Sequence, residues 1–152
     1  MRIYVEFKNR NSSLDYRELA EKMWFKTYLN KELELSHGGD SSWLNDKYTL
    51  DLKWDKSLND KRWVKNKFAT EYISLNPIRD KKYLYFETQH IDIVTVDKRA
   101  LYIMVKELAE AVEGSISQDG MTTWMPLDIF EEQNHELFSM NFETANEISL
   151  KE

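Results

Sequence analysis

Carboxylates concentrate in the C-terminal part of the chain, in a stretch that also contains a tryptophan. From Glu113 to Glu136 the sequence reads EGSISQDGMTTWMPLDIFEEQNHE. Surface carboxylates attract a basic protein over a long range, and an aromatic ring among them adds contact area. The stretch therefore predicts a non-catalytic binding protein that meets a basic protein partner, in an inhibitor or immunity-type role. The predicted partner-binding residues are Glu110, Glu113, Asp119, Trp124, Asp128, Glu131, Glu132 and Glu136.

The net charge of −6 is unevenly distributed along the chain. Residues 1–82 hold 17 Lys and Arg against 13 Asp and Glu, a net of +4. Residues 83–152 hold 4 against 14, a net of −10. Such an asymmetry indicates either that the two parts attract each other within one fold, or that the acidic part faces a basic partner.

Three histidines, His37, His90 and His135, could take part in acid–base or metal chemistry. Glu131 and His135 would share a helix face, but a di-metal site needs a second such pair from a facing helix. His90 and Asp92 would lie on one side of a strand, where the carboxylate could orient the imidazole. Because no nucleophile can be placed beside them, we expect no catalytic residue, no metal and no cofactor. An enzymatic activity is left open but not favoured.

The most basic stretch, Lys53 to Lys67, carries six basic and two acidic residues together with Trp54 and Trp63. Basic groups neutralise phosphates and aromatic rings stack on bases, so nucleic-acid binding is one alternative function. The isoelectric point of about 5.2 argues against it. Five Trp, eight Tyr and seven Phe give another alternative, a small-ligand or nucleotide-binding domain with an aromatic-lined cleft.

Composition and length indicate one domain over residues 1–152, with no cysteine available for a disulfide or a thiolate metal site. The start of the chain, MRIYVEFKNR, lacks the apolar run of a signal peptide. No segment approaches the roughly 20 apolar residues of a membrane helix. We therefore expect a cytoplasmic protein that does not enter the membrane, and the sequence predicts no oligomeric state.

The N-terminal part predicts strands over 3–7 and 48–54, from alternating apolar and polar residues, and a short strand at 33–35 that HGGD at 37–40 would break. A helix is expected over 14–28, with Ser12 or Ser13 as its cap. The segment 57–75 is ambiguous. We favour a helix over 57–71, and the alternative is a strand over 69–75 with Ala69, Glu71, Ile73 and Leu75 on one face.

The C-terminal part predicts strands over 83–88 and 91–96, then a helix capped by Thr95 or Asp97. Gly114 would end this helix in the left-handed region. Asp119-Gly120 would turn a hairpin, and Pro126 or Asp128 would begin a short helix. A last strand or helical turn follows, and 143–152 is expected to be a frayed tail. The helix would bury the stripe Leu101, Met104, Val105, Leu108 and Val112.

These elements predict an α+β fold, because helices alternate with strands while the strands have one polar face. We expect an antiparallel or mixed sheet packed on one face by two main helices. Its core would be a decorated ferredoxin-like unit.

Overall fold

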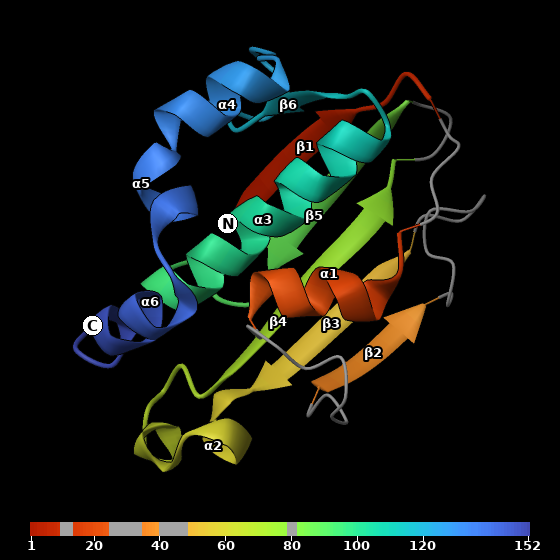
Figure 1. The fold of residues 1–152 in the computed structure, drawn as a ribbon. Helices are drawn as coiled ribbons and strands as arrows, with labels where there is room; N and C mark the ends of the chain where they lie inside the picture. Colours follow the sequence, from red (N-terminus) through yellow and green to blue (C-terminus); the bar gives the residue numbers. More distant parts are fainter. Residues whose placement is uncertain (10–13, 25–34, 40–48, 79–81) are drawn as a thin grey trace.

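The computed structural model of the chain describes residues 1–9, 14–24, 35–39, 49–78 and 82–152 (Figure 1). The strands are β1 (Arg2–Glu6), β2 (Leu35–Gly39), β3 (Leu50–Asp55), β4 (Thr70–Pro77), β5 (Tyr83–Thr88) and β6 (Ser115–Ser117). The helices are α1 (Tyr16–Met23), α2 (Lys56–Asn59), the 3-10 turn η1 (Lys61–Trp63), α3 (Thr95–Ala111), α4 (Leu127–Gln133), α5 (His135–Ser139) and α6 (Phe142–Ser149).

The strands form one sheet in the order β2-β3-β4-β5-β1-β6, in which every neighbouring pair is antiparallel. When the β2–β3 hairpin is set aside, the chain runs β1-α1-β4-β5-α3-β6 and the sheet order is β6-β1-β5-β4. That is the split β-α-β arrangement of ferredoxin-like folds. The α+β prediction with a decorated core of this kind is therefore confirmed, and the hairpin is the decoration.

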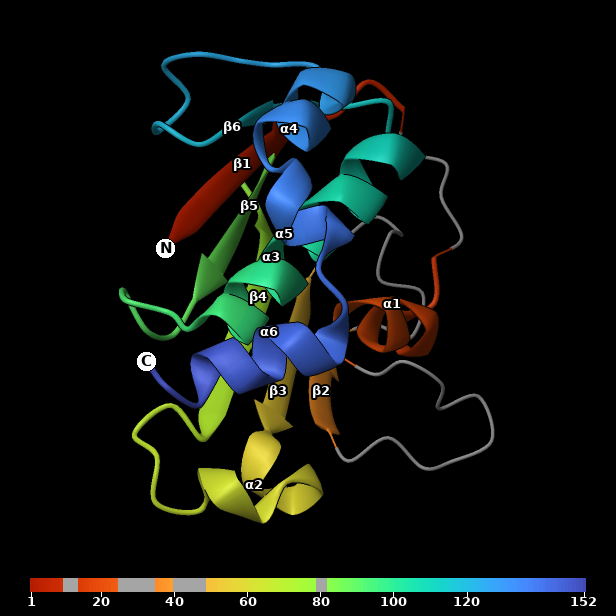
Figure 2. The same ribbon diagram turned by 60° about the vertical axis from the view of Figure 1, so that its left-hand side comes forward.

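Within the described residues, helices cover one face of the sheet (Figures 1 and 2). Alternate residues of the strands, such as Ile3, Val5 and Phe86, are buried against α1 and α3. The stripe predicted on α3 is buried throughout, as an amphipathic helix requires. The other face, which we call the open face, carries the alternating side chains Arg2, Tyr4, Glu6, Asp51, Lys53, Asp55, Thr70, Tyr72, Ser74, Asn76, Tyr83, Tyr85 and Glu87.

The C-terminal residues form a packed helix where the sequence predicted a frayed tail over 143–152. α6 lies against α3, and its Ala145 is fully buried. The Ser149 hydroxyl accepts a hydrogen bond from the Val96 N–H at 2.8 Å. The Glu152 carboxylate accepts from the N–H and the hydroxyl of Thr95, at 2.8 and 2.7 Å. The tail therefore supplies the cap of α3, because Val94 at its N-cap offers no side-chain hydrogen bond.

The helix predicted over 57–71 is wrong, and the alternative strand is right. Asp55 and Asp60 each cap a separate short turn, which divides the segment into α2 and η1. β4 then begins at Thr70, with Glu71 on the buried face as the alternative required.

Three further predictions differ from the structure. The segment 37–39 continues β2 instead of breaking it, since glycine is tolerated where a strand pairs on one side. Residues 91–94 form no strand in the described chain, because α3 starts at Thr95. Asp15 caps α1 by accepting from the Arg17 N–H at 2.7 Å, while Ser12 and Ser13 lie outside the described residues. The predicted helix positions 25–28 lie outside them too.

Gly114 has a different role from the predicted one. Glu113, with φ of 53°, takes the left-handed conformation at the end of α3. A Cβ on Gly114 would lie 2.7 Å from Cγ1 of Val5 and 2.8 Å from the carbonyl oxygen of Glu6. Glycine is needed here because the chain passes so close to β1.

Replacing Gly114 with alanine is expected to lower the free energy of unfolding by about 1–3 kcal/mol, the usual cost of forcing an extra carbon into packed structure. Urea denaturation measures the loss. Gly38→Ala is the matched control, because its Cβ would meet nothing closer than 3.8 Å. A loss for Gly114→Ala no larger than for the control would contradict the close approach.

Candidate functional site

α4 and α5 carry the acidic surface and are held on α3 by an aromatic cluster. The Phe130 side chain is fully buried. Its ring stacks on Tyr102 of α3 at a centroid distance of 5.3 Å and meets Phe138 of α5 edge-on at 5.8 Å. The short helix predicted to begin at Pro126 or Asp128 is present as α4, and its N-cap is Pro126. With Phe130 inward, the polar side chains of α4 are directed to solvent.

Most of the predicted partner-binding carboxylates are exposed on these helices. Glu110 and Glu113 lie at the end of α3, and Asp128, Glu132 and Glu136 on α4 and α5; all five are exposed. Within the described chain none of the five has an ion pair or a side-chain hydrogen bond. We call these five residues the acidic face.

Two residues of the acidic face, Glu110 and Glu132, are unfavourable for the helices that carry them, whereas Asp128 and Glu136 lie in the first turns of α4 and α5. α3, α4 and α5 have no basic residue in their last turns. The C-terminal end of a helix carries partial negative charge, so carboxylates placed there are repelled by the helix dipole. The fold therefore gains nothing from Glu110 and Glu132, which lie in or beside such last turns.

Glu131 differs from its neighbours because it is used within the fold. Its carboxylate forms an ion pair with Lys106 of α3, which raises the pKa of the Lys106 ammonium. Glu107 likewise pairs with Lys22 of α1 at 2.5 Å. These pairs join the helices, and in the described chain they engage Lys22 and Lys106 with carboxylates outside the acidic face.

Asp119 also has a structural role. Its carboxylate accepts from the Ser117 hydroxyl, from the Thr122 and Thr123 N–H groups, and from the Thr123 hydroxyl at 2.6 Å. These hydrogen bonds lower the pKa of Asp119 to about 2, and the two from Thr123 have the largest effect. The sequence predicted a two-residue hairpin turn, whereas the structure has this longer loop. The hydrogen bonds of Asp119 hold the loop together, and the bridge between Ile116 and Met125 closes its ends.

Trp124 lies at the end of the same loop, away from the acidic face. Its indole is half-buried and stacks on Tyr83 of β5, with ring centroids 5.3 Å apart and planes 19° apart. Because Tyr83 belongs to the open face, the predicted site residues fall into two groups. One is on the helices and the other is on the sheet.

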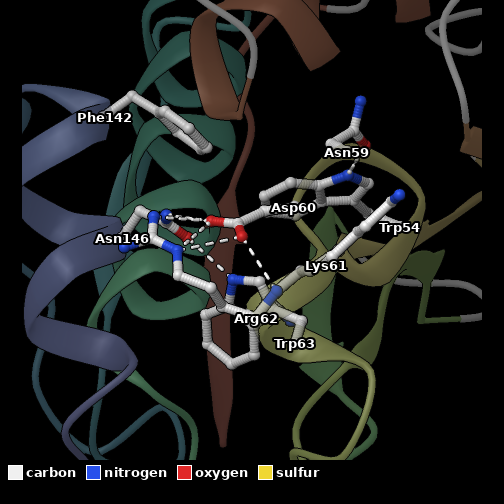
Figure 3. A pocket seen from close by; sticks show the side chains of 9 residues that line it. Trp54, Asn59, Asp60, Lys61, Arg62, Trp63, Phe142 and Asn146 are labelled. Carbon is white, nitrogen blue, oxygen red and sulfur yellow. Dashed lines mark hydrogen bonds and ion pairs between the residues drawn. The ribbon is translucent and has the colours of Figure 1, made fainter.

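A cavity of about 390 Å³ lies at the end of the sheet where β3 leads into α2, between the α2–η1 segment and α6 (Figure 3). Trp54, Trp63 and Phe142 line it, as expected for an aromatic-lined cleft. Both tryptophans are at most 1% exposed, so the cavity offers little aromatic surface.

The polar groups of this cavity are largely paired with one another. Figure 3 shows Asp60 between Asn146 and Arg62, with Oδ2 3.2 Å from the Asn146 amide and 2.7 Å from the guanidinium. Arg62 lowers the pKa of Asp60 to about 2. The Trp63 indole N–H donates to Asn146 at 2.9 Å. These contacts join η1 to α6 and leave few donors or acceptors for a ligand.

A buried ion pair joins the start of α2 to the first turn of α3. Lys56 and Asp97 are both inaccessible to solvent, and Nζ of Lys56 lies 2.7 Å from Oδ2 of Asp97. The ammonium donates to the Phe68 carbonyl at 2.8 Å and lies between Trp54 and Trp63, about 5 Å from each ring. Burial raises the pKa of Asp97 to about 7, although Lys56 opposes the shift. Neither Asp97 oxygen accepts a well-aligned hydrogen bond within the described residues.

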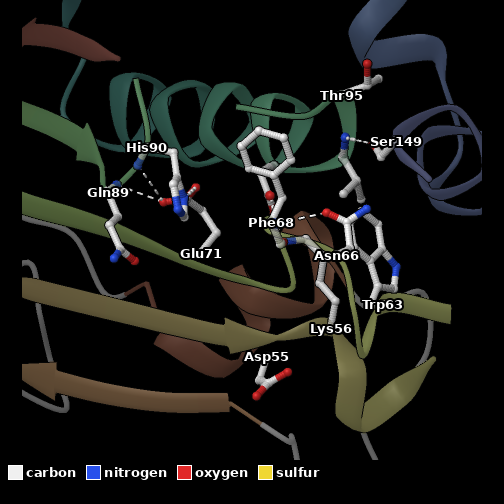
Figure 4. Close-up of polar contacts among 12 residues, drawn as sticks. Asp55, Lys56, Trp63, Asn66, Phe68, Glu71, Gln89, His90, Thr95 and Ser149 are labelled. Atoms are coloured by element: carbon white, nitrogen blue, oxygen red, sulfur yellow. Dashed lines mark hydrogen bonds and ion pairs between the residues drawn. The ribbon is translucent and has the colours of Figure 1, made fainter. Parts of the chain in front are cut away.

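His90 pairs with Glu71 and not with Asp92 as the sequence suggested (Figure 4). Its Nδ1 lies 2.8 Å from Oε2 of Glu71, which is itself only 1% exposed. Oε1 of Glu71 accepts from the N–H groups of Tyr72 and Gln89. The Glu71 carboxylate thus fixes the bend after β5. This role is structural, and it explains the contact with His90 without a catalytic reaction.

The remaining sequence candidates are separated by the fold. Asn134 divides α4 from α5, so Glu131 and His135 do not share a helix, and the described chain holds no cluster suited to a metal ion. The stretch Lys53–Lys67 is not a continuous basic face, because Lys56 is buried. Trp54 and Trp63 belong to the core, so neither presents a face to a base. His37 lies on β2 and Gly38 beside it pairs with β3.

The sequence did not predict the open face or the two pairs with buried carboxylates, Lys56 with Asp97 and His90 with Glu71. Alternation over residues 3–7 places Tyr4 on the polar side of β1, but nothing in the sequence groups it with Tyr83 and Tyr85 of β5. No described helix is long and apolar enough to cross a membrane. No protein-family model, curated protein or solved structure matches the chain.

Proposed function

We propose that this is a non-catalytic binding protein whose acidic face docks on a basic protein partner, in an inhibitor or immunity-type role. The observation that carries the proposal is the group of five exposed carboxylates on and beside α3, α4 and α5 that form no ion pair within the described chain. We propose in addition that it acts in the cytoplasm without a cofactor.

The cost of this charge to the fold supports a role in binding. Glu110 and Glu132 lie in the last turns of α3 and α4, where the partial negative charge of the helix end makes a carboxylate unfavourable. A local feature that works against the fold, without an internal compensation, is typical of a functional surface. A cationic partner would neutralise the carboxylates, and their field would accelerate its approach.

The two alternative functions have weaker support. A small ligand in the cavity of Figure 3 would meet tryptophans that are buried and polar groups that are largely paired with one another. Nucleic-acid binding through Lys53–Lys67 would need exposed rings, and Trp54 and Trp63 provide none.

The test compares two double charge reversals. Glu132→Lys with Glu136→Lys alters the acidic face, and Glu18→Lys with Asp92→Lys alters exposed carboxylates elsewhere. Either double variant changes the net charge from −6 to −2, because each reversal adds two charges. Partners are captured from an extract of the producing cell at about 0.05 M salt, and the association rate is then measured with the purified partner.

We expect the acidic-face variant to associate with a captured basic partner at least about tenfold more slowly than the wild type, since steering is lost. The control variant should keep most of the rate. If both variants bound every captured protein as the wild type does, the proposal would be wrong.

A further inference from the structure

The open face holds a group of aromatic side chains on adjacent strands. Tyr4 faces Tyr85 across the β1–β5 pair, with ring centroids 6.5 Å apart. Tyr83 lies two residues from Tyr85 on the same side, and Trp124 stacks on it. All four rings are half-buried, and the helices of the described chain cover the opposite face of the sheet (Figure 2). Aromatic side chains that remain accessible in this way are typical of interfaces.

The Trp124–Tyr83 stack spans two strands. Trp124 precedes Met125, which forms a bridge with Ile116 of β6, so Trp124 lies on the outer side of β6. Tyr83 is on β5, and the sheet order places β1 and β6 between the two residues. The rings meet by reaching toward each other over β1 and β6. On β1, the residue paired with Tyr83 is Glu6.

Glu6 is a half-buried carboxylate beside this stack. It pairs in register with Tyr83 on one side and Ser115 on the other, so its side chain shares the open face with the Tyr83 ring. Among the described residues the Glu6 carboxylate has neither a hydrogen bond nor an ion pair. A negative charge and an aromatic surface therefore lie together without a cation.

The same face shows what completes such an arrangement. Tyr85 follows Tyr83 by two residues on β5. The Arg2 guanidinium lies 5.1 Å from the Tyr85 ring centroid and forms an ion pair with Glu87 at 2.5 Å. Lys53 similarly lies 5.4 Å from the Tyr72 ring. An aromatic ring, a carboxylate and a guanidinium thus form a unit at Tyr85. At Tyr83 the ring and the carboxylate are present and the guanidinium is absent from the described chain.

We propose that the Trp124–Tyr83 stack and Glu6 bind an arginine side chain of the basic protein partner. This inference rests on the proposed function and extends its binding surface from the helices around β6 to the sheet. Arginine fits better than lysine because its planar guanidinium can lie on an indole while it donates two parallel hydrogen bonds to a carboxylate. Cation–π attraction is also strongest over Trp.

Single-stranded nucleic acid is the main competitor, because exposed aromatics on a sheet of this topology can stack on bases. Charge decides against it. On the open face the carboxylates of Glu6, Asp51, Asp55 and Glu87 outnumber the cations Arg2 and Lys53. Phosphates would be repelled by this surface, whereas an arginine-bearing protein would be attracted.

The experiment titrates the full-length protein with an oligoarginine peptide and, separately, with an oligolysine peptide of equal length. The indole N–H signal of Trp124 is followed by NMR and assigned with Trp124→Phe. We expect oligoarginine to shift this signal at concentrations where oligolysine does not. Glu6→Gln, which keeps the shape of the side chain, should weaken the oligoarginine interaction at Trp124 about three- to tenfold.

Glu132→Lys with Glu136→Lys separates this inference from the proposed function. If that variant weakened the oligoarginine interaction at Trp124 as much as Glu6→Gln does, the specific role of Glu6 would be wrong. If Glu6→Gln had no effect while the acidic-face variant lost partner binding, the arginine site would fall and the proposed function would stand. An equal response to oligolysine, or a Trp124 shift caused by an oligouridylate, would also overturn the inference.

Discussion

Lys56→Met is expected to lower the free energy of unfolding by about 3–5 kcal/mol at pH 8, the usual cost of removing one partner of a buried ion pair. Methionine keeps most of the volume between Trp54 and Trp63 but removes the ammonium. Asp97, which is inaccessible to solvent, then has no counter-charge, and the Phe68 carbonyl loses its donor. Urea denaturation followed by tryptophan fluorescence measures the loss.

The loss should depend on pH, because the folded pKa of Asp97 is about 7 and the ordinary value is 3.8. Between these values the folded state binds more protons than the unfolded state. The stability contributed by Asp97 is therefore complete below pH 3.8 and is lost as the pH rises through about 7. Without Lys56 the folded pKa of Asp97 rises further, so the decline continues to higher pH. The cost of Lys56→Met should accordingly be smaller at pH 5 than at pH 8.

The double variant Lys56→Met with Asp97→Leu is the control for this interpretation. Replacing both partners by apolar groups removes the unpaired charge, and such replacements are often neutral or stabilising. We expect the double variant to recover most of the stability and to lose the Asp97 contribution to the pH dependence. A single variant that cost less than about 1 kcal/mol at pH 8 would show that the pair is not desolvated as the structure has it.

Patterns that reflect burial along one element were predictable from the sequence. On α3 the apolar stripe from Leu101 to Val112 gave the helix and its buried face correctly, because one surface of a regular helix meets the core. The same reasoning failed where apolar residues do not meet the core. Val64 lies in the segment predicted to be a helix, 57–71, but its side chain is 63% exposed. Ile91 lies in the predicted strand 91–96 but is 86% exposed.

The candidate site divides along the same line. The exposure of Glu110, Glu132 and Glu136 could be predicted, since charged residues opposite an apolar stripe face water. What those charges meet could not. Local spacing suggested His90 with Asp92, whereas sheet register brings Glu71 to His90. The meeting of Trp124 with Tyr83 beside Glu6 likewise depends on strand order, which periodicity within one segment does not encode.

Phe130→Ala is expected to lower the free energy of unfolding by about 3–5 kcal/mol, as is usual for a buried phenylalanine whose space cannot be refilled. The ring is fully buried and contacts both Tyr102 and Phe138, so its removal leaves a cavity between α3 and α4. α4 and α5 are short, and helices of this length depend on packing for their stability. We therefore expect amide hydrogen exchange to become fast in residues 127–139 before it does in the sheet.

Phe138→Ala is the matched control, because the Phe138 ring is only half-buried and should cost clearly less. The comparison also bears on function. If the acidic face acts as a rigid surface, Phe130→Ala should weaken capture of a basic partner without changing any charge, and Phe138→Ala should weaken it less. Equal exchange in the sheet and in α4–α5 would mean that the helices do not open separately, and the acidic face would then be as stable as the core.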